Sequence, residues 1–364
     1  MRNNLFKWVF VLFVIIMFFL SGCDEKLDLS LFPISNNQTI NISDTVYVQQ
    51  YPVWTQFNAP EDVLVGWEPL IYVADTKNNR IVQLDLAGGE IGTLDISGVN
   101  VNYPRRIAQD YNFDLLVLCD SAISSVDTVT VLYRIKLVEV GGIITNAKKK
   151  RIMSSLDGTV LSSSKRKFTG ISVFPDNSYI ITRTGPDNSG IDPDNALLRV
   201  KGRDTIQNIY VYSGFQTTGG GIYSIEKTSS VKVVRNSQTD FIITRSTLEY
   251  GFKVEWFIYD DVNGTYEPKF LPGSYIDLIK KQFGSPMSVA MDNYMNIFIV
   301  DAAKDSLYKY SSSGKLQNGS FGGRGSGENQ LNSPKGVAFF NKVLYIADTG
   351  NNRIVRYKLS TDIN

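Results

Sequence analysis

Short apolar runs alternate with turn residues along most of the chain. The runs are rich in β-branched and aromatic residues, and clusters of Asp, Asn and Gly separate them. No long window in this region shows the period of about 3.6 residues that marks an amphipathic helix. The pattern therefore predicts short antiparallel strands joined by tight turns.

One phrase occurs near both ends of this region. VADTKNNRIVQL, residues 73–84, recurs as IADTGNNRIVRY, residues 346–357, with eight of the twelve positions identical. A weaker copy spans residues 285–310, and fainter copies begin at Tyr103, Phe168 and Thr239. We expect six copies in total, spaced by roughly 45 to 60 residues, and this spacing suits one four-stranded sheet per copy.

A small sheet of this kind has two apolar faces, so it is stable only when other sheets cover both of them. Radial packing covers every face and leaves only short, protected edges. The sequence therefore predicts an all-β, six-bladed β-propeller of four-stranded antiparallel blades. The last copy ends after its third strand at Leu359, so we expect residues 45–57 to supply the missing outer strand and close the ring. Pro52 is compatible with an outermost strand.

The first residues of the chain predict export and lipidation. Arg2 and Lys7 precede an unbroken apolar run that ends in LSGC at residues 20–23, and the run is shorter than the about 20 residues of a membrane-spanning helix. LSGC resembles the lipobox of bacterial lipoproteins, which implies cleavage before Cys23, a diacylglycerol on its sulfur and an acylated amino group. Two or more acyl chains give a stable membrane anchor.

These features divide the chain into three parts. We expect a lipoprotein signal peptide at residues 1–22, a lipidated N-terminus with a flexible tether at 23–44, and the propeller at 45–360. The expected location is extracytoplasmic, anchored to a bacterial membrane at its periplasmic face or at the cell surface. Cys119 has no partner if Cys23 is lipidated, and its apolar surroundings predict a buried thiol.

The repeated phrase resembles the NHL repeat, whose signature runs P-x-G-V-A-V-D and then I-Y-V-A-D-T-x-N-N-R-I. The first and last copies match closely, residues 286–310 match in part, and the glycine-rich stretch 321–334 resembles the lead-in of that family. This resemblance implies a propeller. Some related propellers are lyases that use histidines, and others of the gluconolactonase type hold a divalent ion in the central channel.

The conserved-looking polar residues of the phrase have a structural interpretation. An Asp at the end of a strand can accept backbone N–H groups, an Asn tolerates the left-handed conformation, and an Arg can reach back to a carboxylate. We assign this role to Asp75, Asn79, Arg80, Asp301, Asp348, Asn352 and Arg353.

The composition argues against catalysis. The chain of 364 residues has no histidine, which excludes histidine-based triads, histidine-ligated zinc and imidazole bases. Among the inner-strand entrances, Glu61-Asp62 is acidic, whereas Arg105-Arg106 and Lys335 are basic, a setting hostile to a cation. We therefore expect no enzyme, no cofactor and no metal ion. The alternative is a histidine-independent enzyme of the metal-dependent lactonase or lyase type.

The remaining interpretation is a binding or scaffold propeller for a protein, peptide or glycan. Its net charge of +1 gives no sign of nucleic-acid binding, and we expect a monomer. Arg183 and Arg245 stand where the strong copies carry Asp75 and Asp348. We expect them to share one face with Arg105 and Arg106 as a basic patch for an acidic partner. Alternatively, each pairs with a nearby acid such as Asp187 or Glu249.

Overall fold

The computed structural model describes residues 46–98, 102–123, 127–157, 165–246 and 251–363. Predictions for the signal peptide, for Cys23 and for the tether fall outside these ranges. Within them, no helix is long and apolar enough to cross a bilayer.

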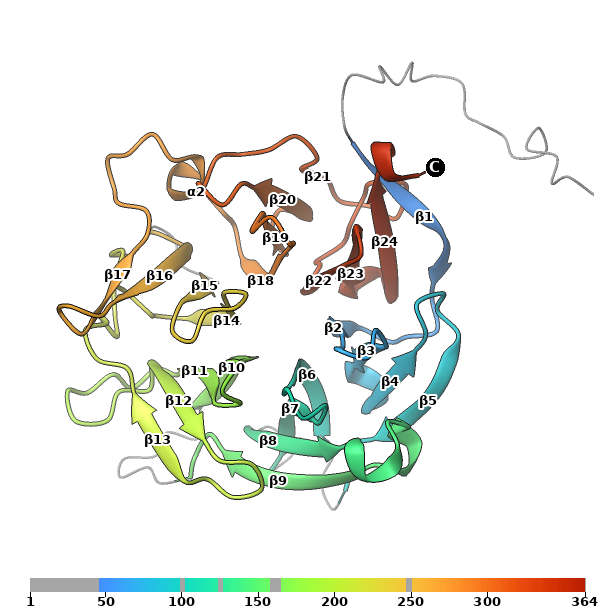
Figure 1. Ribbon diagram of the computed structural model, residues 1–364, viewed down its shortest axis with the longest axis horizontal. Helices are drawn as coiled ribbons and strands as arrows, with labels where there is room; N and C mark the ends of the chain where they lie inside the picture. The colour runs from blue at the N-terminus through green and yellow to red at the C-terminus, as the bar shows by residue number, and fades with distance from the viewer. Residues whose placement is uncertain (1–45, 99–101, 124–126, 158–164, 247–250, 364) are drawn as a thin grey trace, which may run out of the picture. The chain divides into compact units, whose positions relative to one another are not determined.

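Six four-stranded antiparallel sheets are arranged in a ring around a central axis, as Figure 1 shows. We call the region between the six inner strands the channel. The predicted all-β, six-bladed propeller is thus confirmed. Blades 1 and 2 consist of β2 (Pro60–Val65), β3 (Ile71–Asp75), β4 (Arg80–Leu84) and β5 (Glu90–Asp95), then β6 (Asn102–Gln109), β7 (Leu115–Ala122), β8 (Thr128–Lys136) and β9 (Lys148–Ser154). Blades 3 and 4 consist of β10 (Lys167–Val173), β11 (Tyr179–Thr184), β12 (Ala196–Lys201) and β13 (Asn208–Val211), then β14 (Thr228–Val233), β15 (Phe241–Arg245), β16 (Val254–Asp260) and β17 (Thr265–Pro268). Blades 5 and 6 consist of β18 (Pro286–Met291), β19 (Ile297–Asp301), β20 (Ser306–Tyr310) and β21 (Phe321–Gly322), then β22 (Gly336–Phe340), β23 (Val343–Asp348), β24 (Arg353–Leu359) and β1 (Tyr47–Trp54).

Among the residues that the structure describes, helical structure is confined to short turns between strands and one turn after β24. They are η2 (Thr76–Asn78), η3 (Val138–Val140), η4 (Ile144–Asn146), α2 (Asp277–Lys280), η5 (Thr349–Asn351) and η6 (Ser360–Asp362).

The ring closes as the sequence predicts. β1 pairs antiparallel with β24, from Tyr47 opposite Leu359 to Trp54 opposite Ile354. Tyr47 and Trp54 are buried, and they pack into the clusters on the two sides of blade 6. The N-terminal strand therefore joins the two ends of the fold by hydrogen bonds and by apolar contact.

The core is divided among the blade interfaces. Each of six hydrophobic clusters of described residues combines side chains from two neighbouring blades. Cys119 is one of these buried side chains, in the cluster between blades 1 and 2, and burial raises the pKa of its thiol. This arrangement is what radial packing of two-faced sheets requires.

Hydroxyl groups fasten neighbouring blades at the end of the channel where the inner strands begin. Thr76 Oγ1 donates to Pro104 O at 2.7 Å, and Thr349 Oγ1 donates to Pro60 O at 2.7 Å. In the middle blades, Thr169 Oγ1 donates to Thr228 O and Ser229 Oγ donates to Pro286 O, both at 2.6 Å. These bonds fix the inner strands relative to one another, and so fix the channel that they line.

Candidate functional site

The two ends of the channel carry different chemistry. We call the end where the inner strands begin the entrance face and the end where they finish the exit face. On the entrance face, five inner strands have an irregular register within their first four residues, and such a bulge redirects a side chain. These redirected residues are Glu61, Arg105, Thr169, Ser229 and Met287.

Glu61 is the centre of an ion-pair network on the entrance face. Its carboxylate lies 2.8 Å from Lys335 Nζ and 3.0 Å from Arg105 Nη2, while Arg105 Nη1 lies 2.8 Å from Asp120. Although burial opposes ionisation, Arg105 and Lys335 hold the pKa of Glu61 below its usual value. Arg105 and Lys335 therefore both pair with Glu61 at this end of the channel.

Arg106 spans the channel just inside this network. The side chain is 7% exposed, and its Nη1 donates to Glu61 O at 3.1 Å. Its Nη2 donates to Met287 O at 3.1 Å, which belongs to β18 of blade 5, across the ring from β6 (Figure 1). A guanidinium thus occupies the middle of the channel, and burial lowers its pKa.

Asp62 and Lys232 face the same part of the channel from blades 1 and 4. Asp62 accepts the backbone N–H groups of Val63 and Ile107, at 3.0 and 2.9 Å. Burial raises the pKa of Asp62 to about 6, opposed by the positive charge of Arg106. Burial lowers the pKa of Lys232, and the charge of Asp62 opposes that shift. Two bases, Arg106 and Lys232, therefore act on the charge of Asp62.

The four arginines predicted to form a basic patch are not equally exposed. Arg105 and Arg106 lie on the entrance face in the network described above. Arg183 donates to Pro193 O at 2.6 Å and pairs with Asp192 at 3.2 Å. Arg245 is fully buried and pairs with the equally buried Glu255 at 3.4 Å. The expectation that Arg245 is exposed is therefore corrected: backbone carbonyls and Glu255 surround its guanidinium.

The polar residues of the repeated phrase hold the turns together. Asp75 accepts Asn58 N and Arg80 Nε, both at 2.7 Å, and Asp348 accepts Asn332 N and Arg353 Nε at the same distance. Asp301 accepts Gly284 N at 2.6 Å and Ser285 N at 2.7 Å. Asn79 and Asn352 each adopt a φ of 55°, in the left-handed region. These contacts are internal to the entrance-face turns.

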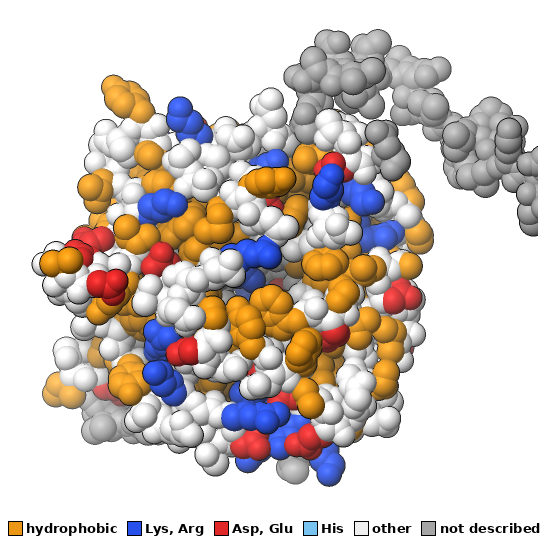
Figure 2. All heavy atoms as spheres, viewed as in Figure 1, with side chains coloured by type: hydrophobic (Ala, Val, Ile, Leu, Met, Phe, Trp, Pro, Cys, Tyr) orange, Lys and Arg blue, Asp and Glu red, His pale blue; other side chains and the backbone are white. Residues whose placement is uncertain are grey.

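The exit face carries exposed aromatic side chains instead of ion pairs. Trp67, between β2 and β3, and Tyr111, between β6 and β7, have ring centroids 4.6 Å apart and exposures of 54% and 37%. Burial raises the pKa of Tyr111, and the charge of Arg235 from blade 4 opposes this shift. Figure 2 looks onto this face and shows hydrophobic side chains around its centre, with basic side chains among them.

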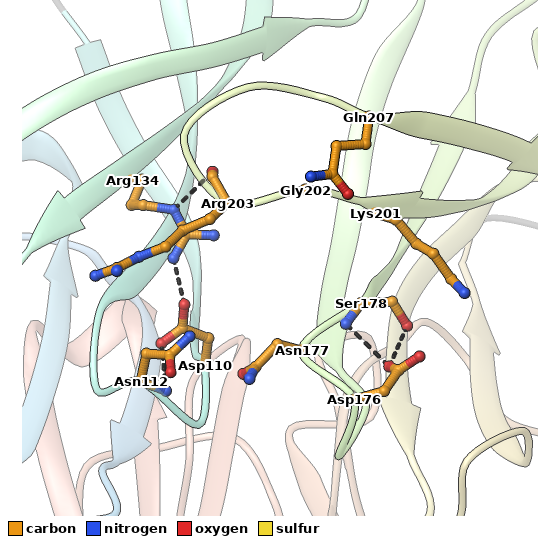
Figure 3. Close-up of a pocket in the computed structure, with 10 residues that line it drawn as sticks. All are labelled: Asp110, Asn112, Arg134, Asp176, Asn177, Ser178, Lys201, Gly202, Arg203 and Gln207. Atoms are coloured by element: carbon orange, nitrogen blue, oxygen red, sulfur yellow. Dashed lines mark hydrogen bonds and ion pairs between the residues drawn. The ribbon is translucent and has the colours of Figure 1, made fainter.

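A hollow of about 270 Å³ lies beside this aromatic pair, between blades 2 and 3 (Figure 3). Its charged side chains are largely paired: Arg134 contacts Asp110, Arg203 contacts Asp114 at 3.0 Å, and Asp176 contacts Arg199 at 3.2 Å. Its lining is completed by uncharged groups and one further base. They are Asn112, Asn177, Ser178, Gly202, Gln207 and Lys201.

Three carboxamides in this hollow retain hydrogen-bonding capacity. Asn177 Oδ1 accepts Tyr111 N at 2.7 Å, which leaves its amino group free. The side chains of Asn112 and Gln207 make no hydrogen bond to any described residue. Figure 3 places Asn112 and Asn177 on one side of the hollow and Gln207 on the other.

Sequence reasoning missed the exit face. Trp67, Tyr111 and the hollow come from turns whose residues match no motif, and only tertiary packing brings blades 2 and 3 together there. No group of three or more acids and cysteines within the described ranges is placed to hold a metal ion.

Comparisons with known proteins establish the fold. Neither known protein families nor curated proteins match this sequence. Among solved structures, a luciferin-regenerating enzyme is similar over 86% of this chain and 95% of its own, with a TM-score of 0.58 and 11% identity. A nutrient-binding protein from Bacteroides thetaiotaomicron is similar over 83% of this chain and 69% of its own, with a TM-score of 0.55 and 12% identity.

A gluconolactonase from Xanthomonas campestris is also similar, over 86% of this chain and 97% of its own, with a TM-score of 0.53 and 12% identity. The similar structures thus include a binding protein and enzymes, and at these identities the likeness concerns the fold alone. The chain is a six-bladed β-propeller whose structural neighbours include gluconolactonase-like proteins.

Proposed function

We propose that this protein is a binding or scaffold propeller, held outside the cytoplasm by acyl chains on Cys23. Its partner is a protein, peptide or glycan. The observation that supports this function is Arg106, whose guanidinium reaches across the channel to Met287 O. The channel centre is where propellers of the gluconolactonase type hold a divalent ion, and a buried cation there disfavours a second one.

The surrounding ion pairs support the same proposal. Glu61 is engaged by Lys335 and Arg105, and Asp62 faces Arg106 and Lys232. A metal ion would have to displace these bases from both carboxylates. No described feature of the channel favours the alternative function, a metal-dependent lactonase or lyase.

A calcium titration of the purified protein without its predicted signal peptide and Cys23, residues 24–364, tests the absence of a channel metal. We expect no saturable heat in calorimetry and the same unfolding midpoint in calcium and in EDTA, because a ligand that binds only the native state raises the midpoint. Saturable one-to-one binding of calcium, with a raised midpoint, would contradict the proposal and favour the enzyme.

The anchor is tested separately by Cys23→Ser. We expect the variant to lose membrane partitioning, because the acyl chains on Cys23 are the proposed attachment. Unchanged recovery in the membrane fraction would contradict a lipoprotein anchor, without bearing on the channel.

A further inference from the structure

The exit face combines two features that each suit a sugar. One is the hollow between blades 2 and 3, and the other is the exposed pair Trp67 and Tyr111. The turn 110–114 belongs to both, because Asp110 and Asn112 line the hollow and Tyr111, between them, packs on Trp67. A ligand longer than the hollow would therefore pass directly onto the aromatic pair.

The hollow favours an uncharged, hydrogen-bonding ligand. Arg134 and Arg203 are neutralised by Asp110 and Asp114, and Asp176 is neutralised by Arg199. Besides the ammonium group of Lys201, the groups that remain available to a ligand among the described residues are the carboxamides of Asn112, Asn177 and Gln207, and a carboxamide carries both donors and an acceptor. Sugar hydroxyls also donate and accept, so they match carboxamides on both counts. Lys201 makes no ion pair with a described residue, and Figure 3 places it at one side of the hollow.

The volume of the hollow limits what it can hold. At about 270 Å³ it lies just below the range of roughly 300 to 1,000 Å³ typical of sites for drug-sized molecules. A single sugar ring is a suitable occupant. None of the residues that line it has a hydrophobic side chain, so the hollow itself is not built for a hydrophobic ligand.

The aromatic pair supplies the complementary contact. A sugar ring has one face of C–H groups, and the negative face of an aromatic ring attracts such groups. The turn that carries Tyr111 is well fixed, since Asp110 Oδ1 accepts Asn112 N and Asp114 N, both at 2.9 Å.

We propose that the exit face binds a neutral saccharide, with one sugar unit in the hollow and the adjoining unit against Trp67 and Tyr111. This proposal rests on the proposed binding function and names the class of its ligand. It assigns no role to the entrance-face arginines.

Calorimetry with defined oligosaccharides tests the proposal. The neutral probes are maltohexaose, cellohexaose, xylohexaose and mannohexaose, and oligogalacturonate is the acidic comparison. We expect saturable binding of at least one neutral probe. Both Trp67→Ala and the double variant Asn112→Ala with Gln207→Ala should weaken it by about tenfold or more. Because these side chains are exposed, the unfolding midpoints should stay close to that of the wild type.

Tyr294→Ala is the matched control, because Tyr294 is an 83% exposed aromatic residue on the exit turn of blade 5, away from the hollow. Its affinity for the probe should equal that of the wild type. The proposal is overturned if no neutral probe binds at millimolar concentration, if only oligogalacturonate binds, or if the Trp67 and carboxamide variants bind as well as Tyr294→Ala. The calcium titration is independent of these outcomes, so failure of the saccharide site is distinguishable from failure of the binding function.

Discussion

Blades 1 and 6, at the seam, carry an aspartate at the end of their second strand. Blades 3 and 4, in the middle of the chain, carry an arginine there. Asp75 lies opposite the inner-strand residue just before the register shift of its blade, and Arg183 and Arg245 hold the same register position in theirs. The carboxylates of Asp75 and Asp348 accept hydrogen bonds from the backbone N–H groups of Asn58 and Asn332. The guanidinium groups of Arg183 and Arg245 instead donate hydrogen bonds to backbone carbonyl oxygens.

Arg245 shows the inverted arrangement most fully. Its guanidinium donates to Glu226 O at 2.9 Å, Phe252 O at 2.9 Å and Gly219 O at 2.5 Å. Two of these carbonyls lie in the segment that enters blade 4, just as Asn58 lies in the segment that enters blade 1. In blades 1 and 4 the position therefore fastens the entering segment to its blade, and the backbone groups of that segment match the side chain, N–H groups for Asp75 and carbonyls for Arg245. Arg183 instead donates to Pro193 O and Asp194 O, which lie just before β12.

The largest effect should come from breaking the seam itself. In the protein comprising residues 24–364, deletion of residues 45–57 removes β1 with Tyr47, Trp54 and Phe57, all of them buried. We expect a loss of about 5 kcal/mol or more in the free energy of unfolding, since each large side chain contributes about 1.5 to 3 kcal/mol. Denaturant unfolding measures this. Deletion of residues 24–42 is the control, and equal midpoints for the two truncations would contradict closure by β1.

A smaller but still large effect is expected from Arg245→Ala in the middle of the ring. The substitution leaves Glu255 buried without its partner, and breaking a buried pair costs about 3 to 5 kcal/mol. Denaturant unfolding of the single variant measures the loss. Arg245→Asp sharpens the comparison, because a carboxylate cannot donate to the surrounding carbonyls. If Arg245→Asp were as stable as the wild type, the polarity of the position would not matter.

The smallest effect in this series belongs to Arg183→Ala. Arg183 and Asp192 keep 11% and 22% of their side chains exposed, so water can replace part of the lost contact. We expect a loss of about 1 to 2 kcal/mol, clearly less than for Arg245→Ala. Parallel unfolding curves of the two variants measure the difference. Equal losses would show that exposure does not separate the two arginines.

The site was less predictable from the sequence than the fold. Asp75, Asn79 and Arg80 lie within a few residues of one another, so their shared turn could be inferred from local chemistry. The contact between Arg106 and Met287 joins residues 181 positions apart. Nothing local distinguishes Arg106 from Arg105, although one crosses the channel and the other pairs with Glu61 and Asp120.

The sequence by itself determined the strands, the six-fold repetition and the closing strand, because these depend on side-chain alternation and turn residues that recur along the chain. Only the tertiary structure decided which polar residues are free and which are engaged. Arg245 is engaged because carbonyls from two separate segments converge on it. The carboxamides of Asn112 and Gln207 are free because blades 2 and 3 meet there around a hollow. Burial and partners of this kind depend on how blades pack, a property that no single stretch of sequence contains.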